Sequence, residues 1–353
     1  MFYTLLETIL VAVAGGFAFC LLNTPIPWTL GPLVTVVLWM SLMKRPIYWP
    51  VLYRNTGLIV LGCMMGASFT METCLSIGRQ LPSMLFATIA TILFTMVTGY
   101  ITYRRTDISL ASSLLGSTPG GLMQMVLLSE EIADTDATIV TFMQTIRLLS
   151  VVFIVPFLAI HGLAGGNSAA APAVGTAAVH SSLLFIPVTI ISALVAARIH
   201  FPTPYLVGPV LGTAALVLSG MEPPDIPPLL ITIAQIAVGT YMGSTIQPTS
   251  LANWKQLLFY ALAGGISVVF FSLAIGWLLT SWHNIPLITS FLSTAPGGMA
   301  EMGITANFVH ADISTITAYQ LFRLLFILFL LPPFLKWYLA HREKIAAARE
   351  RTY

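Results

Sequence analysis

Apolar residues along this chain form long runs that are separated by short polar stretches. Each half of the chain contains six such runs. In the first half they span residues 2–22, 28–43, 51–71, 81–103, 109–130 and 137–160. In the second half they span residues 179–199, 205–220, 228–248, 256–281, 286–307 and 313–338. Most runs are long enough to cross a ~30 Å hydrocarbon layer as helices, so the pattern predicts an all-α polytopic membrane protein.

The fifth run of each half is interrupted at its middle by Pro-Gly-Gly. Residues 116–125 read GSTPGGLMQM, and residues 293–302 read STAPGGMAEM. We call residues 119–121 the first tip and residues 296–298 the second tip. Because Pro and Gly bend or end helices, each tip predicts a kink in a crossing helix or the turn of a hairpin that re-enters the membrane.

The special residues of the two halves match at an offset of 177 residues, which drops to 176 near the end. The matching pairs include Pro27 and Pro204, Gly31 and Gly208, Gly62 and Gly239, Gly66 and Gly243, Asp136 and Asp312, Gln144 and Gln320, and Arg147 and Arg323. The spacing predicts two homologous membrane repeats, residues 1–160 and 179–338. Residues 161–178 form a Gly/Ala-rich linker, and residues 339–353 form a basic cytoplasmic tail.

The orientation of the repeats depends on the path of the fifth runs. If both cross the membrane, each half has six spans and the repeats are parallel. If both are hairpins, each half has about five transmembrane helices plus one broken segment, and the repeats are inverted. Inversion leaves Arg79 as the only basic residue of the loops outside the cytoplasm, so the positive-inside rule favours it. That preference depends on Arg198 and Lys255, and both paths stay open.

Composition narrows the class of protein. The 353 residues are 57% hydrophobic and 8% charged, whereas soluble domains have roughly 25% charged residues. A net charge of +2 gives no reason to expect nucleic acid as a partner. We expect the lipid bilayer and a small-molecule solute as the partners. The sequence does not decide the oligomeric state, and a homo-oligomer is one of the options.

The tips are the first candidate binding residues. One interpretation is that they are packing kinks, since Gly and Pro are common in membrane helices. The other is that each forms a discontinuous helix near the midplane, where unpaired backbone N–H groups face an anion. Water, a bound solute, or a side chain such as Gln144 or Gln320 would then satisfy those groups. The residues expected to bind solute are Ser117, Thr118, Pro119, Gly120, Gly121 and Gln124, with Thr294, Ala295, Pro296, Gly297 and Gly298 in the second half.

The Gln-x-x-Arg motif, with Gln144 and Arg147 in one half and Gln320 and Arg323 in the other, places both side chains on one helix face. Arg147 follows Asp136 by about 16 Å of helix, near the centre of the membrane. An arginine at that depth is a candidate functional residue by default. We expect both motifs to bind a carboxylate-like solute, although the arginines could instead satisfy carbonyls that the broken helices leave free.

Three further features have competing interpretations. Glu301 follows the second tip, where the first half has Gln124, and we expect it to couple transport by carrying a proton. An ion pair with an arginine is its alternative role. Asp136 and Asp312 fit helix N-caps. The Gly-x-x-x-Gly pairs that begin at Gly62 and Gly239 fit close-packing faces.

These motifs together resemble the AbrB-duplication family of bacterial membrane proteins over nearly the whole chain. The resemblance is carried by the Pro-x-Pro and Gly-Pro entry before residue 32 and its copy, the two tips, the Asp before each sixth run and the two Gln-x-x-Arg motifs. It implies a multi-pass protein of the bacterial inner membrane. It does not supply a substrate, and members are labelled as transcriptional regulators or as ammonia monooxygenases.

Both labels fit the residues poorly. A regulator needs a DNA-binding domain, and no segment is polar and long enough to form one. An oxygenase needs a metal or flavin site, but there is no His and carboxylate cluster and no nucleotide-binding glycine motif. We therefore expect no enzyme, no cofactor, no catalytic residue and no metal. The features favour a secondary transporter of a small, carboxylate-bearing solute, with proton coupling through Glu301 as an open option. The alternatives are a membrane-bound oxidative enzyme and a regulatory or sensor subunit.

Overall fold

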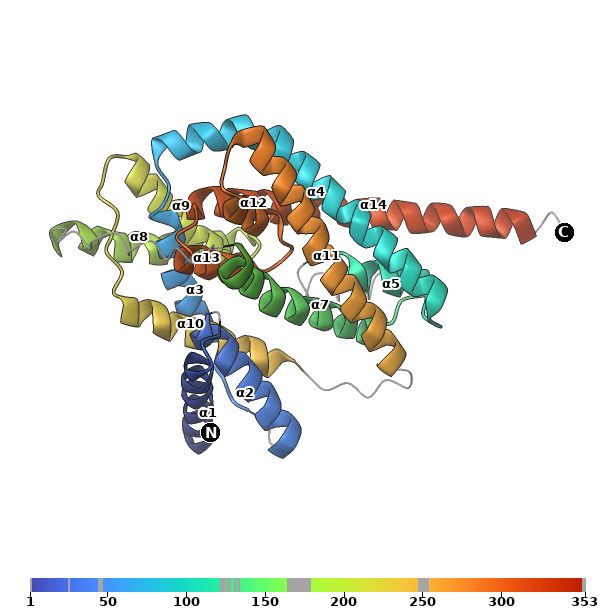
Figure 1. Cartoon of the computed structure of the whole chain (residues 1–353), viewed down its shortest axis with the longest axis horizontal. Coiled ribbons are helices and arrows are strands. Elements are labelled where there is room, and N and C mark those ends of the chain that lie inside the picture. Colours follow the sequence, from blue (N-terminus) through green and yellow to red (C-terminus); the bar gives the residue numbers. More distant parts are fainter. Residues whose placement is uncertain are drawn as a thin grey trace.

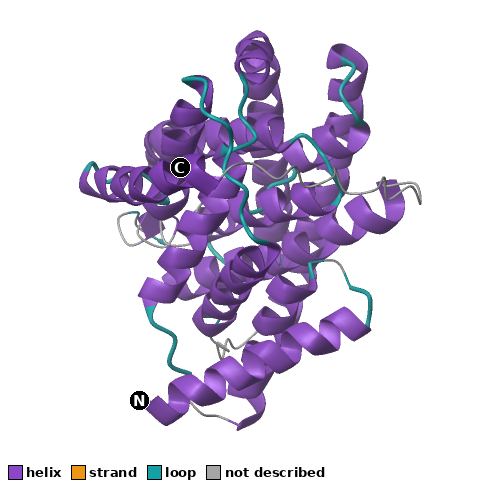
Figure 2. Cartoon of the chain, turned by 90° about the vertical axis from the view of Figure 1, so that its left-hand side faces the viewer, coloured by secondary structure: helices purple, strands orange, loops and turns teal. Residues whose placement is uncertain are grey.

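The computed structural model describes residues 2–24, 26–43, 47–120, 125, 128–129, 132, 134–163, 179–246 and 254–350. The described part is helical, with irregular connections between the helices (Figure 2). Five of its helices are long and apolar enough to cross a membrane, which makes this a multi-pass membrane protein. These five spans lie within α1, α4, the α7 and η1 pair, α11 and α14.

The helices follow the apolar runs with two notable extensions. Up to residue 163 they are α1 (Phe2–Leu21), α2 (Pro27–Met43), α3 (Val51–Gly66), α4 (Met71–Arg105), α5 (Leu110–Ser117), α7 (Ala137–Phe157) and the π-helix η1 (Leu158–Leu163). After residue 178 they are α8 (Val179–Arg198), α9 (Pro204–Leu218), α10 (Pro228–Thr245), α11 (Trp254–His283), α12 (Leu287–Thr294), α13 (Met299–Phe308) and α14 (Ile313–Glu350).

Helix α4 starts ten residues before the expected boundary at residue 81. The start is fixed by a capping box, in which the Thr70 hydroxyl accepts from the Thr73 N–H and the Thr73 hydroxyl accepts from the Thr70 N–H. Pro82 lies inside the helix. The apolar run that starts at residue 81 therefore covers only part of the helix, because the capping box lies one polar stretch earlier. Helix α14 likewise continues past residue 338 to Glu350.

The expected N-caps are confirmed. The Asp136 carboxylate accepts hydrogen bonds from the N–H groups of Thr138 and Ile139, at 2.7 and 3.4 Å. The Asp312 carboxylate accepts from the N–H groups of Ser314 and Thr315, at 3.0 and 3.2 Å. These bonds satisfy donors that have no partner within the first turn of α7 and α14.

The helices pack in two groups (Figure 1). The short-helix bundle contains α1, α2, α3, α8, α9 and α10, in which α3 packs against α9 and α10 packs against α2. The long-helix bundle contains α4, α5, α7, α11, α12, α13 and α14. The main contacts between the bundles are those of α3 with α13 and α14. A shared apolar core joins them, with Leu61 and Met65 of α3 packed near Met299 and Ile304 of α13.

The expected close-packing role of the Gly-x-x-x-Gly pairs is also confirmed. A Cβ built on Gly62 or Gly66 would lie 2.5 Å from a backbone oxygen of α9, that of Leu206 or Val210. Gly243 similarly meets the Leu33 carbonyl oxygen of α2 at 2.6 Å. Since such distances exclude any side chain, the glycines allow the crossed helices to approach each other closely.

Candidate functional site

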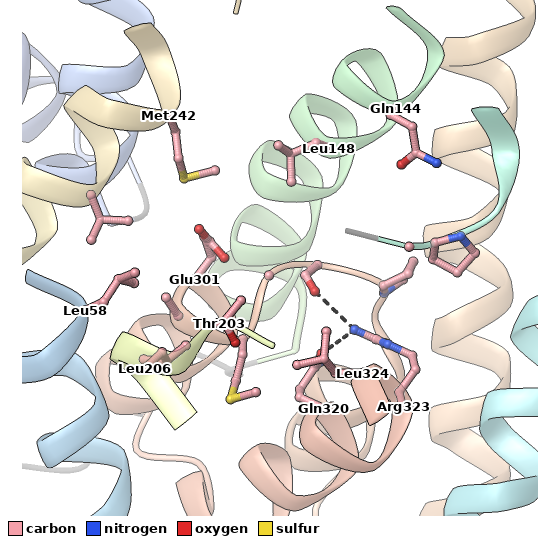
Figure 3. A pocket seen from close by; sticks show the side chains of 18 of the residues that line it. Leu58, Gln144, Leu148, Thr203, Leu206, Met242, Glu301, Gln320, Arg323 and Leu324 are labelled. Carbon is pink, nitrogen blue, oxygen red and sulfur yellow. Dashed lines mark hydrogen bonds between the residues drawn. The ribbon is translucent and has the colours of Figure 1, made fainter. Parts of the chain in front are cut away.

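A cavity of about 320 Å³ lies between the two bundles (Figure 3). Four segments of the long-helix bundle line it. They are the described residues of the two tips and the Gln-x-x-Arg motifs of α7 and α14. Most of the residues that the sequence predicted to bind solute or carry a proton line this cavity. They are Pro119, Gly120, Gln144, Arg147, Pro296, Gly297, Gly298, Glu301, Gln320 and Arg323.

Some of the expected binding residues do not line this cavity. Thr118, Thr294 and Ala295 are buried behind it, in the hydrogen-bonded ends of α5 and α12. Ser117 lines a second, small hollow, which Arg147 and Tyr260 of α11 also line. Gly121 and Gln124 lie outside the described residues.

Both motif glutamines donate hydrogen bonds to carbonyls at the C-terminal ends of α5 and α12. Gln144 donates its amide N–H groups to the carbonyls of Leu115 and Thr118, at 2.6 and 2.8 Å. Gln320 donates in the same way to the carbonyls of Leu292 and Ala295, at 2.8 and 3.0 Å. The last carbonyls of a helix have no partner within it, and these side chains supply one. The glutamine amides thus serve carbonyls at the end of α5 and α12, and not the N–H groups that the sequence suggested.

Arg323 is held by the backbone around the second tip. Its Nη1 donates to the carbonyls of Thr294 and Ala295, at 3.2 and 2.7 Å, and its Nη2 donates to the carbonyl of Gly297 at 3.1 Å. Nη2 also donates to the side-chain oxygen of Gln320. This guanidinium therefore has the structural role that the sequence left open, since it satisfies carbonyls between α12 and α13.

Arg147 occupies the matching position on α7 but has a different environment. Its side chain is 8% exposed, and its Nε and Nη1 atoms have no hydrogen-bond partner. The Oε1 atom of Gln144, one turn earlier on α7, also has none. A buried guanidinium without partners is unfavourable because it has lost its hydration without replacement. Arg147 is therefore the candidate residue for contact with an anionic group in the cavity.

Glu301 lies in the first turn of α13 and is 5% exposed. Its carboxylate folds back beside Gly298, where a Cβ would overlap it. This position places a carboxyl group at the positive end of the α13 dipole. No ion pair joins Glu301 to Arg147 or Arg323, although all three line the same cavity.

The sequence missed the opposite wall of the cavity, which belongs to the short-helix bundle. Its apolar part includes Leu58 of α3, Leu206 of α9 and Met242 of α10. Its polar part includes Arg54, whose guanidinium lies 4.8 Å from the centre of the Tyr241 ring in a cation–π contact. No local pattern identifies these residues, because only the crossing of the bundles brings them opposite the tips.

Comparison with known proteins places the chain in a family. A family model described as "Transition state regulatory protein AbrB" matches residues 28–339. The chain is similar to "Uncharacterized protein YhjN" of Bacillus subtilis (strain 168), with 29% identity over 92% of this chain and 91% of the relative. It is also similar to "Putative regulator AbrB" of Escherichia coli (strain K12), with 24% identity over 94% of this chain and 95% of that protein. Because the family model covers most of its length, this chain is a member of the AbrB family of membrane proteins.

Proposed function

We propose that this protein is a secondary transporter of a small anionic solute in the bacterial inner membrane, and that the solute binds between the two tips. The observation that carries the proposal is the buried guanidinium of Arg147, which lines a cavity of about 320 Å³ and has two nitrogen atoms without partners. A carboxylate is the natural occupant, because its two oxygens match the donors of a guanidinium.

The backbone around the second tip supports an anionic ligand. Gly297 and Gly298 line the cavity directly before α13, and the first N–H groups of that helix have no partner within the helix. Together with the helix dipole they attract negative charge. Glycine lets a ligand approach this backbone closely, because it has no Cβ.

The backbone also supports two homologous repeats. Positive φ angles are uncommon outside glycine. Seven described non-glycine residues have one, and six of them form pairs at the repeat offset: Asn23 and His200, Ile26 and Thr203, and Asp134 and His310. The glycine contacts are paired in the same way, since Gly66 meets Val210 and Gly243 meets Leu33. We infer inverted repeats, each with five spans and a segment broken at its tip, in the arrangement that places a site between discontinuous helices.

Glu301 supplies the coupling in this proposal. It is a carboxylate in the solute cavity without an arginine partner, so it can exchange a proton without first breaking an ion pair. A proton that binds there removes one negative charge beside the solute's anionic group. Solute and proton occupancy are then linked through their mutual electrostatics.

The test is uptake by purified protein in liposomes, with Arg147→Gln as the comparison. A panel of labelled organic anions is presented with and without an inward proton gradient. We expect at least one carboxylate to accumulate in liposomes with the unmodified protein and not in those with the variant. If no organic anion is bound or moved, or if Arg147→Gln transports the same anion equally well, the proposed function is wrong.

A further inference from the structure

We propose that the transported solute is an amphipathic monocarboxylate, with an apolar body of several carbon atoms attached to its anionic group. This inference rests on the proposed function and specifies the substrate class of the same site. Its basis is that apolar side chains line the cavity beside its charged groups. The buried Arg147 and Arg323 come from the long-helix bundle. Leu58, Leu206 and Met242 come from the short-helix bundle, whose polar lining residues include Arg54.

The apolar wall faces the charged side directly. In Figure 3, Leu58, Leu206 and Met242 lie on one side of the cavity, and Gln144, Gln320 and Arg323 lie on the other. None of the three apolar side chains can form a hydrogen bond with a solute. Next to these three side chains, a small polar anion such as phosphate would lose hydration without replacement, whereas a hydrocarbon group would gain from leaving water.

Of the two buried arginines of the cavity, one guanidinium offers unpartnered nitrogens to a carboxylate. Arg323 is already bonded to three carbonyl oxygens and to Gln320. Arg54 at the short-helix wall lies over the ring of Tyr241. Arg147 is thus the arginine of the cavity whose guanidinium has unpartnered buried nitrogens. While Glu301 is ionised, it adds a negative charge to the same space, which disfavours a second carboxylate on the solute.

The size of the cavity fits such a molecule. Its volume of about 320 Å³ lies at the lower end of the range for small-molecule sites, which is about 300–1,000 Å³. A carboxylate bound at Arg147 would leave room for its carbon chain along Leu58 and Leu206. We therefore expect affinity to rise with chain length until the apolar wall is covered.

The experiment measures binding of the straight-chain carboxylates from acetate to hexanoate to the purified full-length protein. The matching neutral amides and succinate are measured alongside, and Arg147→Gln in the same detergent gives the baseline for partitioning into the micelle. We expect affinity to increase up to about fourfold for each added methylene. Arg147→Gln should lose the carboxylate series at every length, and the amides should bind at least about tenfold more weakly than the acids.

A second variant tests the wall itself. Leu206→Asn should flatten the dependence on chain length while acetate still binds. If that variant does not fold, the chain-length series on the unmodified protein still decides the question. Affinity that does not change with chain length, or succinate that binds more tightly than hexanoate, overturns the amphipathic solute and leaves an anion transporter standing. Amides that bind as tightly as acids overturn the proposed function as well.

Discussion

Arg323 is hydrogen-bonded to Gln320, whereas no such bond joins Arg147 to Gln144 at the matching positions of α7. The same motif therefore has two different environments. In α14 the arginine binds the backbone around the second tip and is part of its structure. In α7 the arginine is buried and its Nε and Nη1 have no partner. This asymmetry separates a structural arginine from the arginine that we propose binds the solute, although both belong to the same Gln-x-x-Arg motif.

The first prediction compares Arg147→Gln with Arg323→Gln. Arg147→Gln should weaken anion binding about 10–100-fold, because it removes a charge-assisted hydrogen bond, and it should not lower the unfolding temperature. Arg323→Gln should lower the unfolding temperature, because the carbonyls of Thr294 and Gly297 lose their donor, at about 1–3 kcal/mol each. Thermal unfolding in detergent and ligand binding measure the two effects. Equal unfolding temperatures for the two variants would remove the distinction.

The second prediction concerns Gly298. In Gly298→Ala the new methyl group would overlap the Glu301 carboxylate, which must leave the start of α13. The backbone angle at Gly298, with φ of −72°, accepts alanine, so the protein should fold. The added methyl group and the displaced carboxylate would both take up space in the cavity that Gly298 lines. We therefore expect ligand affinity to fall about tenfold or more. Gly264→Ala on α11 is the matched control, since no atom lies within 4 Å of its added Cβ. An unchanged affinity in Gly298→Ala would contradict a binding role for this backbone.

The third prediction concerns Glu301→Gln. The amide keeps the shape of the carboxylate but cannot exchange a proton. We expect the variant to bind the solute and to take it up into liposomes only down its own gradient, without acceleration by a proton gradient. Uptake with and without the gradient is compared for both proteins. A variant that still responds to the proton gradient would show that another group carries the proton.

The fourth prediction concerns topology. Inverted repeats with five spans each place both termini in the cytoplasm and the linker of residues 161–178 in the periplasm. A reporter fused after Gly166, in the segment that the structure does not describe, should therefore give the periplasmic signal. A reporter at the C-terminus should give the cytoplasmic one. If both report the cytoplasm, each half crosses six times and the repeats are parallel.

A large part of this molecule is determined by the sequence alone. The helical membrane class follows from apolar runs of membrane-spanning length. A helix satisfies its backbone hydrogen bonds within its own segment, so this class can be predicted without knowing how the helices pack. The N-cap role of Asp136 and Asp312 is equally local, because each carboxylate accepts from N–H groups two and three residues later. The break between α12 and α13 was visible as Pro-Gly-Gly for the same reason.

The tertiary structure alone decides what these local features face. Arg147 and Arg323 belong to the same sequence motif, but their environments depend on how each helix packs. Arg323 donates to carbonyls, whereas Nε and Nη1 of Arg147 are buried without a hydrogen-bond partner. Leu58, Leu206 and Met242 are ordinary apolar residues until the crossing of the bundles places them opposite the tips. Hydrogen-bond partners and cavity walls come from residues far apart in the chain. A local sequence pattern cannot predict them, because the packing of distant segments determines those contacts.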